Sequence, residues 1–112
     1  MDARVEAVID LMHQSGGIQF SMCDLSRRVN LSSTRLRQLF KRDTGLSPLQ
    51  YLRDLRIKEA ERLLRLTFLS VKEVACLTAS KDVSHFVRDF KKQYGVTPSE
   101  FRTRNHASRK LA

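Results

Sequence analysis

The residues of this chain that could do chemistry are mostly cationic, and their arrangement occurs twice. The segment 36–51 (LRQLFKRDTGLSPLQY) returns fifty residues later as 86–101 (FVRDFKKQYGVTPSEF). Each copy carries apolar residues at helical spacing, a basic pair, a helix-ending Gly and a Ser/Thr-Pro restart, so one helical unit is used twice. Lysine and arginine along one helix bind phosphates and the edges of bases. The repeat therefore favours a nucleic acid as the partner.

The overall charge of the chain points to the same class of partner. The 112 residues include 21 Lys and Arg against 12 Asp and Glu, which leaves a formal charge of +9 and a sequence pI near 10.3. Such an excess in a short chain is typical of proteins that bind polyanions. With 41% hydrophobic residues, the chain can form one small domain or two very small subdomains that share a core.

Several other classes of protein are disfavoured. No stretch approaches the roughly 18 apolar residues of a membrane span, and the N-terminus lacks a signal-peptide pattern, so we expect a cytoplasmic protein without a membrane partner. Cys23 and Cys76 stand alone, and we expect small buried side chains rather than metal ligands or a disulfide. His13, His85 and His106 are scattered, and no Gly-rich phosphate loop is present. We therefore expect no enzyme, no metal and no cofactor.

Helix caps and apolar spacing predict an all-α chain of about seven helices. Ser21 and Ser70 each precede an acid by three residues, which is the pattern of a capping box. Gly45 ends one helix, and the Gly16-Gly17 pair ends the first. The expected helices cover residues 2–14, 21–29, 32–45, 48–66, 70–78 and 82–94, with a last turn from 97 and a frayed tail at 105–112.

Two parts of this helical pattern have the form of a helix-turn-helix. Residues 21–44 and 70–94 each contain two short helices joined by a tight turn, and the second helix of each pair is basic and amphipathic. One copy would be weak evidence. Two copies, each followed by Gly-x-Ser/Thr-Pro, make the prediction strong.

These motifs resemble the DNA-binding domain of the AraC family of bacterial transcription regulators. The family's Phe-Lys, Gly, Ser/Thr-Pro and aromatic pattern is present at 40–51 and again, more closely, at 90–102, and the segment 55–64 is similar to the family's linker helix. The resemblance implies two homeodomain-like helix-turn-helix subdomains bridged by that helix. The expected division is a first subdomain at 1–47, a linker helix at 48–66, a second subdomain at 67–104 and a flexible tail at 105–112.

The turn residues of the two motifs differ from each other. Asn30 stands at the Gly position of the first turn, and Asn adopts left-handed backbone at modest cost. The second turn has Ala79 where the family usually has Gly. If residue 79 keeps φ > 0, Ala79→Gly should stabilise the fold by up to about 1 kcal/mol.

The spacing of residues in the third helix predicts which side chains read bases. Leu36, Leu39 and Phe40 cluster on one side, which must be the buried side. Residues in the N-terminal half of the opposite side reach base edges, and later basic residues reach phosphates. The expected base contacts of the first motif are Thr34, Arg37 and Gln38, and its phosphate contacts are Arg27, Arg28, Lys41 and Arg42. Arginine matches the guanine edge and glutamine the adenine edge.

The second motif follows the same pattern with fewer polar readers. Phe86 and Phe90 form its buried side, and Val87 stands where the first motif has Arg37, so we expect weaker discrimination between bases. A valine methyl can contact the methyl group of thymine. The expected base contacts are Val83, Ser84, Val87 and Arg88, and the expected phosphate contacts are Lys81, Lys91, Lys92 and Arg102.

The bridging helix sets the expected mode of binding. Nineteen residues at 1.5 Å each span about 28 Å, close to the roughly 34 Å between successive major-groove segments on one face of DNA. One polypeptide can therefore fill two adjacent segments as a monomer. We expect sequence-specific binding of double-stranded DNA and transcription regulation, with RNA polymerase as a further candidate partner. Alternatives are a nonspecific nucleoid-type or RNA-binding protein, a helical adaptor for acidic proteins and, least favoured, an enzyme.

Overall fold

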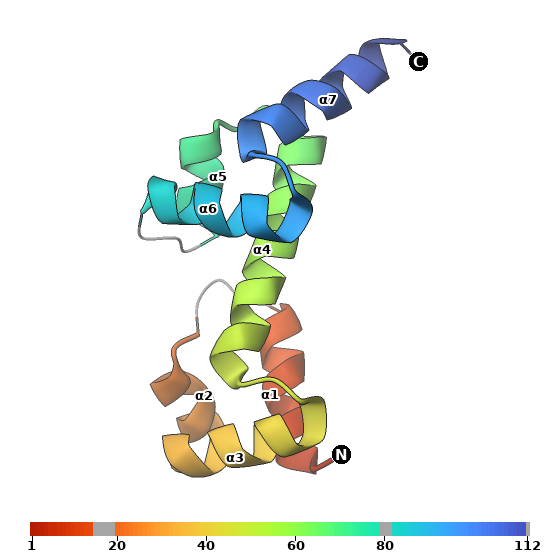
Figure 1. Ribbon diagram of the computed structural model, residues 1–112. Coiled ribbons are helices and arrows are strands. Elements are labelled where there is room, and N and C mark those ends of the chain that lie inside the picture. Colours follow the sequence, from red (N-terminus) through yellow and green to blue (C-terminus); the bar gives the residue numbers. More distant parts are fainter. Residues whose placement is uncertain (15–19, 79–81, 112) are drawn as a thin grey trace. The chain divides into compact units, whose positions relative to one another are not determined.

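The computed structural model describes residues 1–14, 20–78 and 82–111, and these residues form helices and short connections (Figure 1). Within them there is no β-strand, and the expected all-α class is confirmed. The helices are α1 (Ala3–Gln14), α2 (Met22–Arg28), α3 (Ser33–Thr44), α4 (Pro48–Leu66), α5 (Val71–Leu77), α6 (Val83–Tyr94) and α7 (Pro98–Leu111). None of the helices in this part of the chain combines the length and apolar character that crossing a bilayer demands.

The helices begin where the caps predict. Ser21 accepts a hydrogen bond from the backbone amide of Asp24, whose carboxylate accepts one from the Ser21 amide, and Ser70 and Glu73 repeat this capping box at α5. These bonds satisfy amides that have no partner inside the helix. The side chains of Ser32 and Asp82 accept hydrogen bonds from backbone amides at the starts of α3 and α6. Both α3 and α6 therefore have defined first turns.

The ends of α3 and α6 need left-handed backbone, and the sequence supplies glycine there. Gly45 has φ +80° and Gly95 has φ +79°, and the amide of each closes the last turn of its helix. Asn30, in the turn between α2 and α3, has φ +55°, as its type predicts. Three sequence expectations fall outside the residues that the structure describes: the Gly16-Gly17 stop, the Ala79 turn and the Lys81 phosphate contact.

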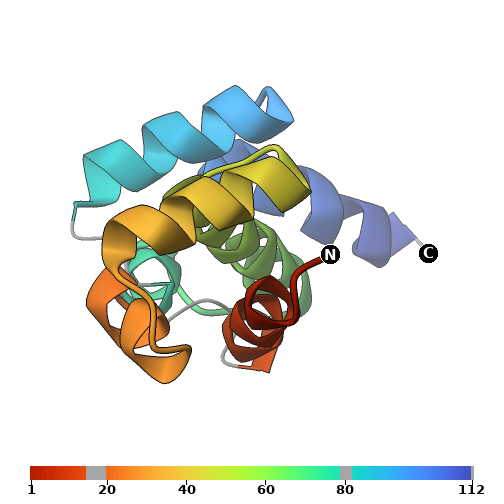
Figure 2. The same cartoon turned by 90° about the horizontal axis from the view of Figure 1, so that it is seen from below.

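The chain divides into two compact units, Met1–Arg56 and Ile57–Ala112, and the boundary falls inside α4. In unit 1, α3 is seen lengthwise in both Figure 1 and Figure 2, whereas α1 is upright in the first view and nearly end-on in the second, so α3 crosses α1. Their apolar faces meet in one core together with α2 and the first half of α4. The buried side chains of this core are Val5, Val8, Met12, Leu25, Leu36, Leu39, Phe40 and Leu52.

Unit 2 has its own core, which is richer in aromatic rings. Phe90 is fully buried, with its ring centre 4.7 Å from that of Tyr94 and 5.5 Å from that of Phe101. The contact between Phe90 and Phe101 packs α7 against α6. The other buried residues of the core come from α4, α5 and α6: Ala60, Leu64, Val74, Ala75 and Phe86. The helices α3 and α6 therefore pack on separate cores.

Two expectations need correction. The sequence predicts only one turn after Thr97 and a frayed tail from 105, but α7 continues to Leu111. No Gly or Pro follows Pro98, so nothing in the chain stops the helix once Thr97 has capped it. Cys23 and Cys76 are free and exposed, not buried. Each lies two positions from a buried residue of its helix, Leu25 or Val74, and two positions turn a side chain about 200° away from that residue.

Candidate nucleic-acid interface

The outer face of α3 carries the first set of predicted contacts. Leu36, Leu39 and Phe40 are buried at 2% exposure or less, which fixes the rotation of α3 on its core. The side chains predicted to contact DNA are all exposed: Thr34, Arg37, Gln38, Lys41 and Arg42. The structure therefore brings these five residues together on one exposed helix.

One further residue of α3 belongs to this surface although the sequence interpretation did not include it. Arg35 is exposed, and its Nη1 donates a weak hydrogen bond of 3.5 Å to Oε1 of Gln38. The i,i+3 spacing of an arginine and a glutamine could have indicated the contact. Arg35 adds a positive charge beside the predicted base readers and contacts the Gln38 amide.

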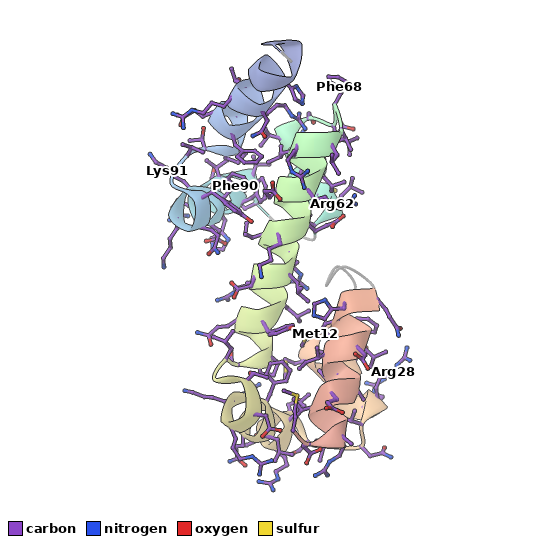
Figure 3. The ribbon with its side chains drawn as sticks, turned by 90° about the vertical axis from the view of Figure 1, so that its right-hand side faces the viewer. Met12, Arg28, Arg62, Phe68, Phe90 and Lys91 are labelled. Carbon is purple, nitrogen blue, oxygen red and sulfur yellow. The ribbon has the colours of Figure 1, made fainter. Side chains whose placement is uncertain are left out.

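The end of α2 adds two cations to unit 1. Arg27 and Arg28 are exposed, and the guanidinium carbon of Arg28 lies 5.9 Å from the centre of the Phe20 ring, a cation–π contact. Figure 3 shows Arg28 projecting from the surface of unit 1. Together with Asp24, these three residues line a shallow cleft. In a helix-turn-helix, the first helix crosses the DNA backbone, so both arginines are placed where phosphate contacts are expected.

The carboxylate of Asp43, in the last turn of α3, accepts two hydrogen bonds. Its Oδ1 accepts a hydrogen bond from Nε of Arg42 at 3.1 Å, and its Oδ2 accepts one from the backbone amide of Asp2 at 2.9 Å. The Asp2 amide and then the Arg42 guanidinium hold the pKa of Asp43 below its usual range. Arg42, one of the predicted phosphate contacts, is thus paired within the chain.

The outer face of α6 carries the second set. Figure 3 shows Lys91 pointing outward, and Phe90 is fully buried in the core of unit 2. Five of the predicted contacts on α6 are exposed: Val83, Ser84, Arg88, Lys91 and Lys92. Val87 differs, because it is half-buried and packs against the core of unit 2. Less of its surface is available to a thymine methyl than the sequence suggested.

An acid and a histidine also lie on α6, and neither was among the predicted DNA contacts. Nδ1 of His85 lies 3.4 Å from Oδ2 of Asp89, one helical turn away. Asp89 stands where the first copy has the buried Leu39. Each of the two helices carries one acid, but α6 has three Lys and Arg residues where α3 has four, so α6 is the less positive of the two.

Arg102, also predicted to contact phosphate, is instead bonded within unit 2. Its Nε donates to the backbone carbonyl of Leu64 at 3.3 Å, and its Nη2 is buried. The last carbonyls of a helix have no partner inside it and attract a basic side chain. This placement ties α7 to the end of α4 and does not favour the predicted phosphate contact.

The described residues hold no group of three or more His, Cys, Asp or Glu that could bind a metal ion.

The family model described as a helix-turn-helix domain matches residues 25–104. The transcriptional activator RhaR of Mannheimia succiniciproducens is 32% identical over 102 residues, which are 91% of this chain and 37% of that protein. The chain belongs to the AraC family of helix-turn-helix DNA-binding domains.

Solved structures agree with this AraC-family assignment. The DNA-binding domain of AdpA, determined in complex with a target DNA, is 27% identical, with a TM-score of 0.87 and coverage of 99% of this chain and 100% of that one. The C-terminal domain of the response regulator yesN from Fusobacterium nucleatum is 34% identical, with a TM-score of 0.78 and coverage of 87% and 95%.

The family gives this domain its general role. AraC-family DNA-binding domains bind DNA in a sequence-specific way and regulate transcription, which is not an enzymatic activity. The chain spans 37% of the length of the Mannheimia activator and 35% of the RhaR activator of Yersinia pseudotuberculosis. The domain therefore corresponds to about a third of such a regulator.

Proposed function

We propose that this domain reads two adjacent major-groove segments of double-stranded DNA, one with α3 and one with α6, as the DNA-binding part of a transcription regulator. The observation that carries the proposal is the outer face of α3. Its polar side chains are exposed on the side away from a fully buried apolar stripe, in the second helix of a helix-turn-helix. This is the helix that enters the major groove in such motifs.

Within α3, position along the helix separates two roles. Thr34, Arg37 and Gln38 lie in the N-terminal half, where side chains reach base edges, and Arg37 can engage the O6 and N7 atoms of guanine. Lys41 and Arg42 lie one turn later and contact phosphates. In unit 1, Arg27 and Arg28 extend the phosphate contacts onto α2.

For α6, we propose the same division with less discrimination between bases. Ser84 and Arg88 supply the polar contacts, Val83 and the remaining surface of Val87 touch apolar base edges, and Lys91 and Lys92 meet phosphates. Lys81 completes the proposed set of phosphate contacts, and Arg102, which bonds to the Leu64 carbonyl, is left out of it. The half-buried position of Val87 and the acid at Asp89 support weaker base reading by this helix than by α3.

The two-segment mode is supported by α4. It is one continuous helix of 19 residues, and 1.5 Å per residue gives a length of about 28 Å, near the roughly 34 Å repeat of the major groove. One chain with this connection needs no second copy to reach both segments, so we propose monomeric binding for this domain. For the full regulator, RNA polymerase is the second partner we propose, because several of the relatives are named transcriptional activators.

A nonspecific nucleic-acid-binding protein is the alternative that the charge alone would support. It would need the excess of +9 but not two helices with exposed polar N-terminal faces. Selection of bound sequences from a random DNA pool would give the preferred site. That labelled site is then competed with genomic DNA and with structured RNA at about 150 mM salt, where specific binders show at least a thousandfold preference. A ratio near one would support the alternative.

A further inference from the structure

We propose that Asp43 is a positioning residue for DNA binding, which holds the Arg42 guanidinium so that its two terminal amino groups face a DNA phosphate. The inference rests on the proposed function, because it assumes that the last turn of α3 meets the DNA backbone. It gives a role to an acid that lies beside a proposed phosphate contact, where charge alone would predict that an acid weakens binding.

Asp43 is a fixed anchor. Its side chain is only 11% exposed, and Oδ2 accepts the backbone amide of Asp2 at 2.9 Å from the start of α1. The Asp2 carboxylate is itself held by the Nη2 group of Arg4 at 3.1 Å and by the backbone amide of Arg4 at 2.8 Å. The position of Asp43 therefore depends on two helices of unit 1 and not on its own rotamer alone.

Arg42 is the exposed partner of this anchor. Its side chain is 61% exposed, and Nε donates to Oδ1 of Asp43 at 3.1 Å. A guanidinium has five N–H donors in a planar fork, so a bond through Nε leaves both terminal amino groups for a phosphate. An exposed ion pair adds little by its charge. Ordering a long side chain before binding, however, raises affinity by roughly 2- to 10-fold.

The second copy of the repeat lacks this device. Its aligned positions hold Lys92 and Gln93, both exposed. A lysine ammonium is a point charge without a planar fork, so it cannot be held through one nitrogen while presenting a pair of others. The geometry thus predicts that the role of Asp43 depends on an arginine at position 42.

A double-mutant cycle tests this dependence. The dissociation constant for the preferred site is measured at about 150 mM salt for the wild-type chain, Asp43→Ala, Arg42→Lys and the double variant. Asp10→Ala is the control for charge, because Asp10 is exposed on α1 and its loss changes the net charge by the same amount. Asp43→Asn is a second variant that keeps one oxygen for the Asp2 amide and replaces the oxygen that accepts from Arg42 with an NH2 donor. Circular dichroism melts show whether each variant is folded at the assay temperature.

We expect Asp43→Ala and Asp43→Asn each to weaken binding by roughly 2- to 10-fold with Arg42 present, and Asp43→Ala not to weaken it in the Arg42→Lys background. Asp10→Ala should leave binding unchanged or slightly tighter. Unchanged or tighter binding by folded Asp43→Asn, or an equal loss in both backgrounds, would overturn the positioning role while leaving the proposed function intact. Failure of the wild-type chain to prefer its site over scrambled DNA would overturn both.

Discussion

Replacing Arg37 and Lys41 by alanine, one at a time, distinguishes a base contact from a phosphate contact. Both residues are exposed on α3, and each change removes one positive charge. Alanine, lysine and arginine all favour helix, and the buried stripe of α3 is untouched. The free energy of unfolding should therefore change by less than about 0.5 kcal/mol for either variant.

The expected losses of affinity differ in kind. If the planar fork of Arg37 engages a guanine edge, Arg37→Ala should cost about 1–3 kcal/mol on the preferred site, which is roughly 5- to 160-fold. Scrambled DNA should lose much less, and selection at one or two adjacent base positions should relax. Lys41→Ala should weaken binding to preferred and scrambled DNA by similar factors, and it should reduce the log–log salt slope by about one.

Fluorescence anisotropy with labelled preferred and scrambled duplexes, titrated at several salt concentrations, measures all of these quantities. The two variants control for each other, because their charge changes are equal. Equal losses on both DNAs for Arg37→Ala would show that α3 does not read a base there. A specific loss for Lys41→Ala, with no change in salt slope, would refute the assignment of that residue to phosphate.

Three further results are expected. Six exposed cations are proposed phosphate contacts among the described residues, at positions 27, 28, 41, 42, 91 and 92. A plot of the logarithm of the association constant for the preferred site against the logarithm of the salt concentration should therefore have a slope of about −5. A slope of −1 or −2 would exclude a DNA-backbone interface of this size. Gly45→Ala should lower stability by about 1 kcal/mol in thermal melts, because Gly45 has φ +80° while the space for a Cβ is open; an unchanged melting temperature would mean that this end of α3 tolerates strain. The Arg4 side chain lowers the pKa of Asp2 from 3.8 to about 2, so the stability that ionised Asp2 contributes is present above about pH 4 and is lost as pH falls through 2. The difference in melting temperature between the wild-type chain and Asp2→Asn should therefore shrink between pH 4 and pH 2. A constant difference would contradict this linkage.

Most of the helices could be predicted from the sequence because their signals are local. A capping box joins residues three apart, as at Ser21 and Asp24, and a left-handed residue such as Asn30 reflects its own backbone preference. The apolar stripe of α3 repeats at helical spacing, so its opposite face could also be derived. Six of the seven helices therefore lie close to their predicted bounds, and α7 is longer because a helix without Gly or Pro has no local stop signal.

The sequence by itself determined the helical class, the two copies of the motif and the exposed face of α3, because the signals for them lie within short stretches of the chain. Only the tertiary structure decided the surroundings of individual contact residues. The Asp2 amide meets Asp43 across 41 positions of sequence, and Arg102 meets the Leu64 carbonyl across 38. Such pairs depend on how helices pack in the folded unit, and no periodicity encodes them. That packing holds Arg42 beside an anchored acid and turns Arg102 toward α4.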